Sequence, residues 1–190
     1  MSARAASSQA TYDRILEAAA QLLLEGFVDA VTLDAVARRA CVTVQTIIRR
    51  FGSRARLLEV AFHAANERAV SKRGDTPPGD IVAAVSGLFD HYEEIGDSVI
   101  RALAQEERVA AFRVPLALGR SAHRDWVIRA FEPYLARCDP SNRDEVLRAL
   151  IVSTDVYTWK LLRRDMGLTR LEAEFVVQRL LRALFGEQGG

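Results

Sequence analysis

Apolar residues recur at helical spacing along almost the whole chain, and this pattern constrains the fold more than any other feature. The first clear case is a stripe at positions i, i+3, i+4, i+7 and i+8, formed by Ile15, Ala18, Ala19, Leu22 and Leu23. No stretch combines sustained period-2 alternation with β-branched enrichment, as a half-buried strand would. The sequence therefore predicts an all-α protein of about nine helices.

Capping residues divide the N-terminal part into four of these helices. Gly26 can end the first helix in the left-handed conformation, which glycine adopts without steric cost. The next three starts are marked by hydroxyl side chains that can accept an N–H from the following turn, namely Thr32, Thr43 and Ser53. They predict two short helices, ending at Ala40 and Arg50, and a longer helix that reaches about Arg73.

A proline-rich connection over residues 74–79 separates this part from the rest, because a helix cannot run through its two adjacent prolines. We expect a flexible tail over residues 1–10, one domain over residues 11–73 and a second over residues 74–190. In the second domain, the first helix is predicted to end near Gly96. A second helix is predicted from about Ser98 to Phe112, and a third is predicted to start at about Pro115. The last two helices are each predicted to begin with a capping box. The first of them begins at Ser141 with Asp144 and ends at Gly167, and the second begins at Thr169 with Glu172.

The two short helices indicate the function. They are too short to be stable alone, so they must pack against neighbours, and only a tight break over residues 41–43 separates them. Such a pair forms a helix-turn-helix, whose second helix enters the DNA major groove. Seven residues of this region can reach phosphates or base edges: Thr32, Thr43, Gln45, Thr46, Arg49, Arg50 and Arg54.

Charge is distributed unevenly along a chain whose formal total is only +1. Residues 1–73 hold 11 basic and 7 acidic side chains, whereas residues 74–190 hold 15 and 18. A basic end on a nearly neutral protein indicates a polyanionic partner, which supports double-stranded DNA.

The N-terminal part resembles the DNA-binding domain of TetR-family transcriptional regulators over about residues 11–62. The matching runs are Arg14-Ile-Leu-Glu-Ala-Ala, Leu24-Glu-Gly-Phe, Val31-Thr-Leu-Asp-Ala-Val-Ala, Val42-Thr-Val-Gln-Thr-Ile, Phe51-Gly-Ser-Arg and Leu57-Leu. The resemblance implies that the motif spans about residues 32–51. It also implies that the remainder is a variable helical domain that dimerises and holds an effector.

Four positions depart from the family pattern. The family usually has Gly where this chain has Cys41, and a left-handed residue there would cost on the order of 1 kcal/mol. Ile48 and Arg50 stand where the family has Tyr and His or Tyr, so we expect an altered operator preference. Arg54 replaces the usual Lys, and both can contact a phosphate.

Two late apolar stripes are candidates for a homodimer interface, because a palindromic operator requires two recognition helices about 34–36 Å apart. The predicted interface residues are Leu150, Tyr157, Leu161, Val176, Val177, Leu180, Leu181 and Leu184. For the stripe over residues 173–184, the alternative interpretation is an intramolecular core.

Aromatic residues with a polar tip are candidates for an effector pocket, namely Tyr92, Trp126 and Tyr157. We predict no metal and no cofactor, since His91 and its acidic neighbours point in different directions on a helix. No catalytic motif occurs, so no enzymatic activity is expected.

The sequence thus predicts a ligand-responsive DNA-binding regulator. We expect a repressor that binds a palindromic operator as a homodimer and is released by a small hydrophobic or amphipathic effector. We expect it in the cytoplasm and without a membrane partner, because its two cysteines lack a disulfide or metal spacing and no apolar run reaches about 20 residues. The alternative is a helical ligand-binding or interaction module with weakened DNA recognition.

Overall fold

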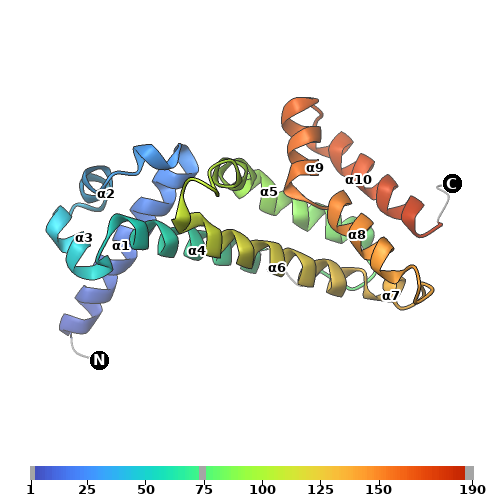
Figure 1. Cartoon of the computed structure of the whole chain (residues 1–190), viewed down its shortest axis with the longest axis horizontal. Helices are drawn as coiled ribbons and strands as arrows, with labels where there is room; N and C mark the ends of the chain where they lie inside the picture. Colours follow the sequence, from blue (N-terminus) through green and yellow to red (C-terminus); the bar gives the residue numbers. More distant parts are fainter. Residues whose placement is uncertain (1–2, 73–75, 187–190) are drawn as a thin grey trace. The chain divides into compact units, whose positions relative to one another are not determined.

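The computed structural model describes residues 3–72 and 76–186 of the 190-residue chain. Its helices are α1 (Ala3–Glu25), α2 (Leu33–Ala40), α3 (Val44–Phe51), α4 (Arg54–Lys72), α5 (Ile81–Leu103), α6 (Arg113–Ala130), α7 (Glu132–Leu135), α8 (Arg143–Ser153), α9 (Val156–Lys160) and α10 (Arg170–Leu184) (Figure 1). Short 3-10 turns, η1 (Val28–Ala30) and η2 (Ala110–Phe112), and the π-helical η3 (Leu161–Asp165) join some of them. Residues 3–72 and 76–186 contain no strand, which confirms the all-α prediction, and none of their helices has the length and apolarity to span a membrane.

The chain divides into two compact units. Unit 1 comprises Met1–Arg68 and Arg101–Ala117, and unit 2 comprises Ala69–Ile100 and Leu118–Gly190. The end of α5, the loop after it and the start of α6 thus group with the N-terminal helices, which the sequence did not indicate. The predicted boundary between residues 73 and 74 lies outside the described residues.

Helix α1 is longer than predicted. It begins at Ala3, so most of the segment expected as a flexible tail is helical. The segment is rich in alanine, the strongest helix former, and within it the Thr11 hydroxyl donates to the Ser7 carbonyl at 3.0 Å. Gly26 follows the end of α1 as predicted, but the left-handed conformation expected for it is wrong. The helix ends at Glu25, but Gly26 is not among the glycines with positive φ.

The observed end of helix α5 differs most from the predicted helix boundaries. The helix continues through Gly96 to Leu103, where the sequence predicts an end and a second helix to Phe112. Gly96 serves packing instead of termination, because a Cβ there would lie 2.5 Å from Cζ3 of Trp159. The first part of the second predicted helix, residues 98–103, thus belongs to α5, and its last part forms the 3-10 turn Ala110–Phe112.

The predicted long helix from Ser141 to Gly167 is divided. Its capping box is wrong, since the Ser141 hydroxyl donates to Asp139 and α8 starts after Asn142 without a side-chain cap. Helix α8 ends at Ser153, and Asp155 then caps α9 by accepting the Tyr157 N–H at 2.9 Å. The left-handed Gly167, with φ of 67°, is confirmed, and so is the capping box of Thr169 and Glu172.

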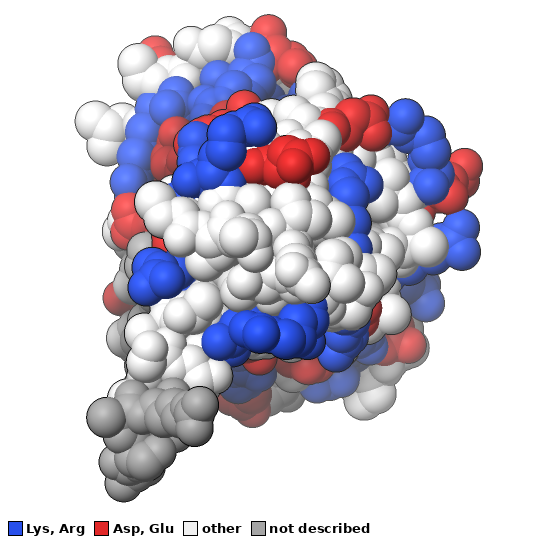
Figure 2. Space-filling model, turned by 90° about the vertical axis from the view of Figure 1, so that its left-hand side faces the viewer, with Lys and Arg blue, Asp and Glu red and all other residues white. Residues whose placement is uncertain are grey.

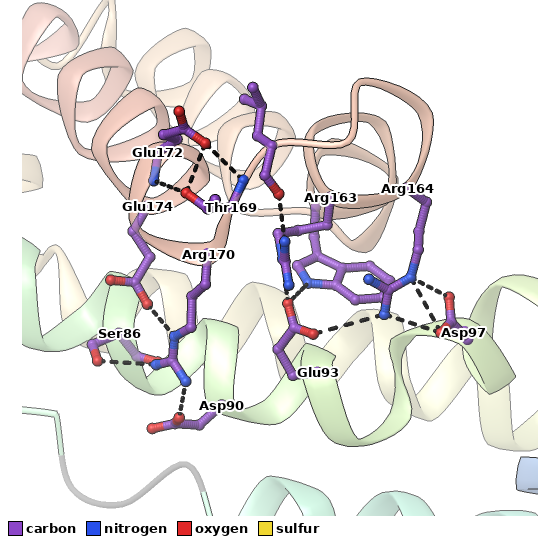
Figure 3. Close-up of polar contacts among 12 residues, drawn as sticks. Ser86, Asp90, Glu93, Asp97, Arg163, Arg164, Thr169, Arg170, Glu172 and Glu174 are labelled. Atoms are coloured by element: carbon purple, nitrogen blue, oxygen red, sulfur yellow. Dashed lines mark hydrogen bonds and ion pairs between the residues drawn. The ribbon is translucent and has the colours of Figure 1, made fainter.

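Arginine–carboxylate pairs tie the late helices of unit 2 to α5 (Figure 3). Arg163 donates to Glu93 at 2.5 Å, Arg164 to Asp97 at 3.0 Å and Arg170 to Asp90 at 2.7 Å. Burial by itself raises the pKa of Glu93, but the hydrogen bonds from Arg163 and Trp159 and the nearby positive charges outweigh it and leave this pKa below its usual value. The surroundings of Glu93 therefore favour its ionised form.

Candidate nucleic-acid interface

Helix α3 is held in unit 1 by one apolar face. Ile47 and Phe51, four residues apart, are buried, and the Phe51 ring stacks on Tyr12 of α1 with centroids 4.9 Å apart. Gln45 and Arg49 occupy the opposite side of the helix and are exposed. The sequence pattern of α3 therefore fixes which side chains face solvent.

The turn between α2 and α3 is a Schellman motif. Cys41 has φ of 51°, its N–H donates to the Arg38 carbonyl at 3.3 Å, and the Val42 N–H donates to the Ala37 carbonyl at 3.0 Å. This left-handed conformation is what the family's usual glycine would adopt at no cost. Cys41 thus carries the backbone strain that the sequence predicted if this position required positive φ.

Both predicted threonine caps are present. Oγ1 of Thr32 accepts the Ala35 N–H at 3.1 Å, and Oγ1 of Thr43 accepts the Thr46 N–H at 3.2 Å. The hydroxyls of Thr43 and Thr46 lie a further 3.0 Å apart. Ser53 caps α4 in the same way through the Arg56 N–H. The threonines therefore set the start of α2 and α3, where exposed N–H groups favour phosphate.

The remaining two predicted contacts, Arg50 and Arg54, have partners within unit 1. Nη1 of Arg50 donates to the Ser8 hydroxyl at 3.2 Å, a contact that the sequence analysis missed because it treated residues 1–10 as a tail. Arg54 is half-buried and donates from Nε to the Val31 carbonyl at 2.9 Å and from Nη2 to the Val28 carbonyl. Of the predicted arginines, Arg49 alone is fully on the surface.

Basic side chains border the face that carries α2 and α3. Figure 2 shows a central area without charged groups, with Lys and Arg side chains below it and a mixture of basic and acidic side chains above it. Arg38 is exposed, whereas Arg39 pairs with Glu25 at 2.8 Å. The hydrogen bond with Glu25 raises the pKa of Arg39 above its usual value. Such a border places positive charge where phosphates would pass beside an uncharged centre.

Two of the three predicted effector contacts come together in unit 2. The buried Tyr92 hydroxyl donates to the Thr154 carbonyl at 3.2 Å, and Oγ1 of Thr154 lies 3.2 Å from Nε2 of His123. The His123 ring stacks on Trp126, with centroids 5.7 Å apart. Tyr157, in contrast, is 57% exposed on α9. In the described ranges, no three His, Cys, Asp or Glu residues are placed to hold a metal.

The predicted dimer residues separate into three groups by exposure. Leu150, Val177 and Leu181 are buried in the core of unit 2, which for Val177 and Leu181 is the alternative interpretation of their stripe. Val176 and Leu184 are half-buried. The exposed apolar side chains of α8, η3, α9 and α10 include three predicted residues and four that the sequence analysis missed: Tyr157, Leu161, Leu180, Val152, Met166, Leu171 and Phe175. Their spacing does not distinguish a surface from a core stripe, so only the fold reveals them.

The comparisons with known proteins agree with this geometry. Residues 15–61 match the model of the bacterial regulatory proteins of the tetR family. A crystal structure of a protein from Rhodococcus sp., assigned to the TetR-family transcriptional regulators, is similar in fold, with a TM-score of 0.68 and 19% identity over 93% of this chain and 99% of that one. No curated protein matches the sequence. Residues 15–61, which contain the helix-turn-helix, thus match the tetR family of bacterial regulatory proteins, and the chain shares the fold of the Rhodococcus protein.

Proposed function

We propose that the protein is a transcriptional repressor that binds a palindromic operator as a homodimer and is released by a small hydrophobic or amphipathic effector. The observation that carries this proposal is the two-sided character of α3. Ile47 and Phe51 hold the helix to unit 1, while Gln45 and Arg49 are exposed on its other side. Gln can pair with adenine through two hydrogen bonds and Arg with guanine, so this side suits a major groove.

The homodimer is supported by the exposed apolar side chains of α8 to α10. Leu171 is 77% exposed, Phe175 59% and Leu161 51%. Concentrated apolar surface of this kind marks contact sites in proteins. A second copy meeting it through a two-fold axis would give two recognition helices, which a palindrome requires.

The effector site is supported by the buried group around Thr154. Tyr92 and Trp126 offer large apolar faces, while His123 and the Thr154 hydroxyl are polar. This combination suits a ligand with an apolar body and a polar group. Helix α4 contains residues of both units and would transmit the ligand state, and a coupling of about 1–3 kcal/mol would weaken operator binding about 5- to 150-fold.

The test is to select genomic DNA fragments with the purified full-length protein at about 150 mM salt and to titrate the enriched sequences against salt concentration. We expect a short palindrome whose binding constant falls steeply with salt, with a slope of about −0.9 for each phosphate contact. Arg49→Gln should reduce the affinity at least tenfold and change the preferred bases at one position of each half-site.

Arg124→Gln is the matched control, since it also removes an exposed arginine, but from α6 in unit 2. It should bind like the wild type. Failure of the folded wild type to enrich any sequence, or an equal loss in both variants, would contradict the assignment of α3 as the recognition helix.

A further inference from the structure

The connection between α1 and α2, residues Gly26–Val31, receives arginine side chains from two distant parts of unit 1. Arg54, the first residue of α4, donates to the carbonyls of Val31 and Val28. Arg101, near the end of α5, donates to the carbonyl of Leu24 at 2.5 Å. The Val28 and Val31 carbonyls lie within the connection and the Leu24 carbonyl lies just before it, so one guanidinium group holds the connection itself and the other holds the end of α1 that leads into it.

The contacts made by Arg54 use the edge of the guanidinium that recognises a phosphate best. Nε and Nη2 point in the same direction and form the fork that can bind two oxygens at once. Here both atoms donate to backbone carbonyls next to a helix start; the Val28 carbonyl also accepts the Val31 N–H at 3.0 Å. A phosphate at this fork would have to displace two internal hydrogen bonds.

The Arg101 contact has a different origin but the same effect. The Leu24 carbonyl is one of the last four in α1, which have no partner within the helix, and a cation at that end also interacts favourably with the helix dipole. Arg108 adds little, because its pair with Asp29 at 3.2 Å is between side chains that are 64% and 73% exposed. The stretch 101–117 therefore contacts α1 through Arg101, and it contacts α4 through Phe112, whose ring lies 5.2 Å from that of Phe62.

We propose that Arg54 and Arg101 are positioning residues for operator binding, which fix α2 and the recognition helix relative to α1, and that Arg54 is not a phosphate contact. The proposal rests on the proposed DNA-binding function. The Val31 carbonyl directly precedes Thr32, the cap of α2, so loss of Arg54 would release the start of α2 and lower the fraction of protein in the binding-competent arrangement. The apparent affinity falls by that fraction.

Salt dependence separates the two roles. Arg54→Gln and Arg54→Lys should each weaken binding to the selected operator about tenfold at 25 °C, with the slope of log K against log salt unchanged. Lys keeps the charge but cannot donate to two carbonyls through a planar fork. Arg101→Gln should behave likewise, and the double variant Arg54→Gln with Arg101→Gln should lose less than the two single losses combined, since both hold the same segment, residues 24–31.

Hydrogen–deuterium exchange tests positioning without DNA. The amides of Ala35 and Val36, which bond to Thr32, should exchange about tenfold faster in both Arg54 variants. Arg56→Gln is the matched control, because Arg56 lies on the same turn but pairs only with Glu59 of its own helix. It should leave these amides unchanged. Thermal melts verify that each variant is folded at the assay temperature.

An Arg54→Lys variant that binds like the wild type, together with an Arg54→Gln variant whose salt slope flattens by about 0.9 or more, would overturn the proposal and restore Arg54 as a phosphate contact. Unchanged exchange at Ala35 and Val36 would overturn it too. Absence of any operator for the wild type would instead count against the proposed function, and the exchange measurement would still decide the positioning role.

Discussion

Gly96→Ala is expected to destabilise the protein, although alanine is normally the better residue inside a helix. In an exposed helix interior this exchange stabilises by about 0.5–1 kcal/mol. At position 96 the new Cβ would lie 2.5, 2.7 and 2.9 Å from three ring carbons of Trp159. Trp159 is only 1% exposed, its Nε1 donates to Glu93 at 3.3 Å, and the Arg164 guanidinium lies 4.5 Å from the ring centroid. The ring therefore cannot move away cheaply.

Overpacking of this kind costs about 1–3 kcal/mol. After the helix-propensity gain is subtracted, we expect a net loss of about 1–2 kcal/mol and a melting temperature lower by about 2–8 °C. The assay is thermal and urea unfolding of the full chain. Gly26→Ala is the control, because its Cβ would meet only the Ala30 Cβ at 4.0 Å.

A double-mutant cycle makes the reasoning sharper. In a Trp159→Leu background the ring is gone, so Gly96→Ala should become neutral or stabilising by up to about 1 kcal/mol. A Gly96→Ala variant with a raised melting temperature in the wild-type background, or the same loss in both backgrounds, would refute the assignment of Gly96 as the space for Trp159.

Three further changes test other parts of the structure. Cys41→Gly should stabilise the protein by about 0.5–1 kcal/mol in urea unfolding, because it removes the penalty of a left-handed side chain, and a destabilised variant would contradict this. Thr43→Ala should cost about 1 kcal/mol through the lost α3 cap, with weaker operator binding, whereas Thr43→Ser should retain both; equal losses would exclude capping as the cause. The lowered pKa of Glu93 contributes stability that is present above its unfolded value and is lost as the pH falls below about 4, so Glu93→Gln should be less stable at pH 7 and show a shallower loss in acid than the wild type. A parallel acid profile would refute that link.

The local features of the DNA-binding part could be predicted from the sequence alone. The caps at Thr32, Thr43 and Ser53 depend on one hydroxyl and the following turn, so neighbouring residues suffice to predict them. The exposed side of α3 follows from helical periodicity in the same way. The positive φ of Cys41 was suggested only by the resemblance, because the family usually has Gly at this position.

The tertiary structure decided what depends on residues far apart in the chain. The sequence predicts a helix end at Gly96, and only the fold shows that Trp159, 63 positions later in the sequence, packs against this glycine. The sequence predicts a phosphate contact at Arg54, and only the fold shows that its fork donates to the carbonyls of Val28 and Val31. The sequence predicts an interface residue at Leu150, and only the fold shows that it is buried in unit 2. Periodicity and capping report interactions within a few residues, whereas burial and the partner of a long cationic side chain are set by segments that the chain brings together only on folding.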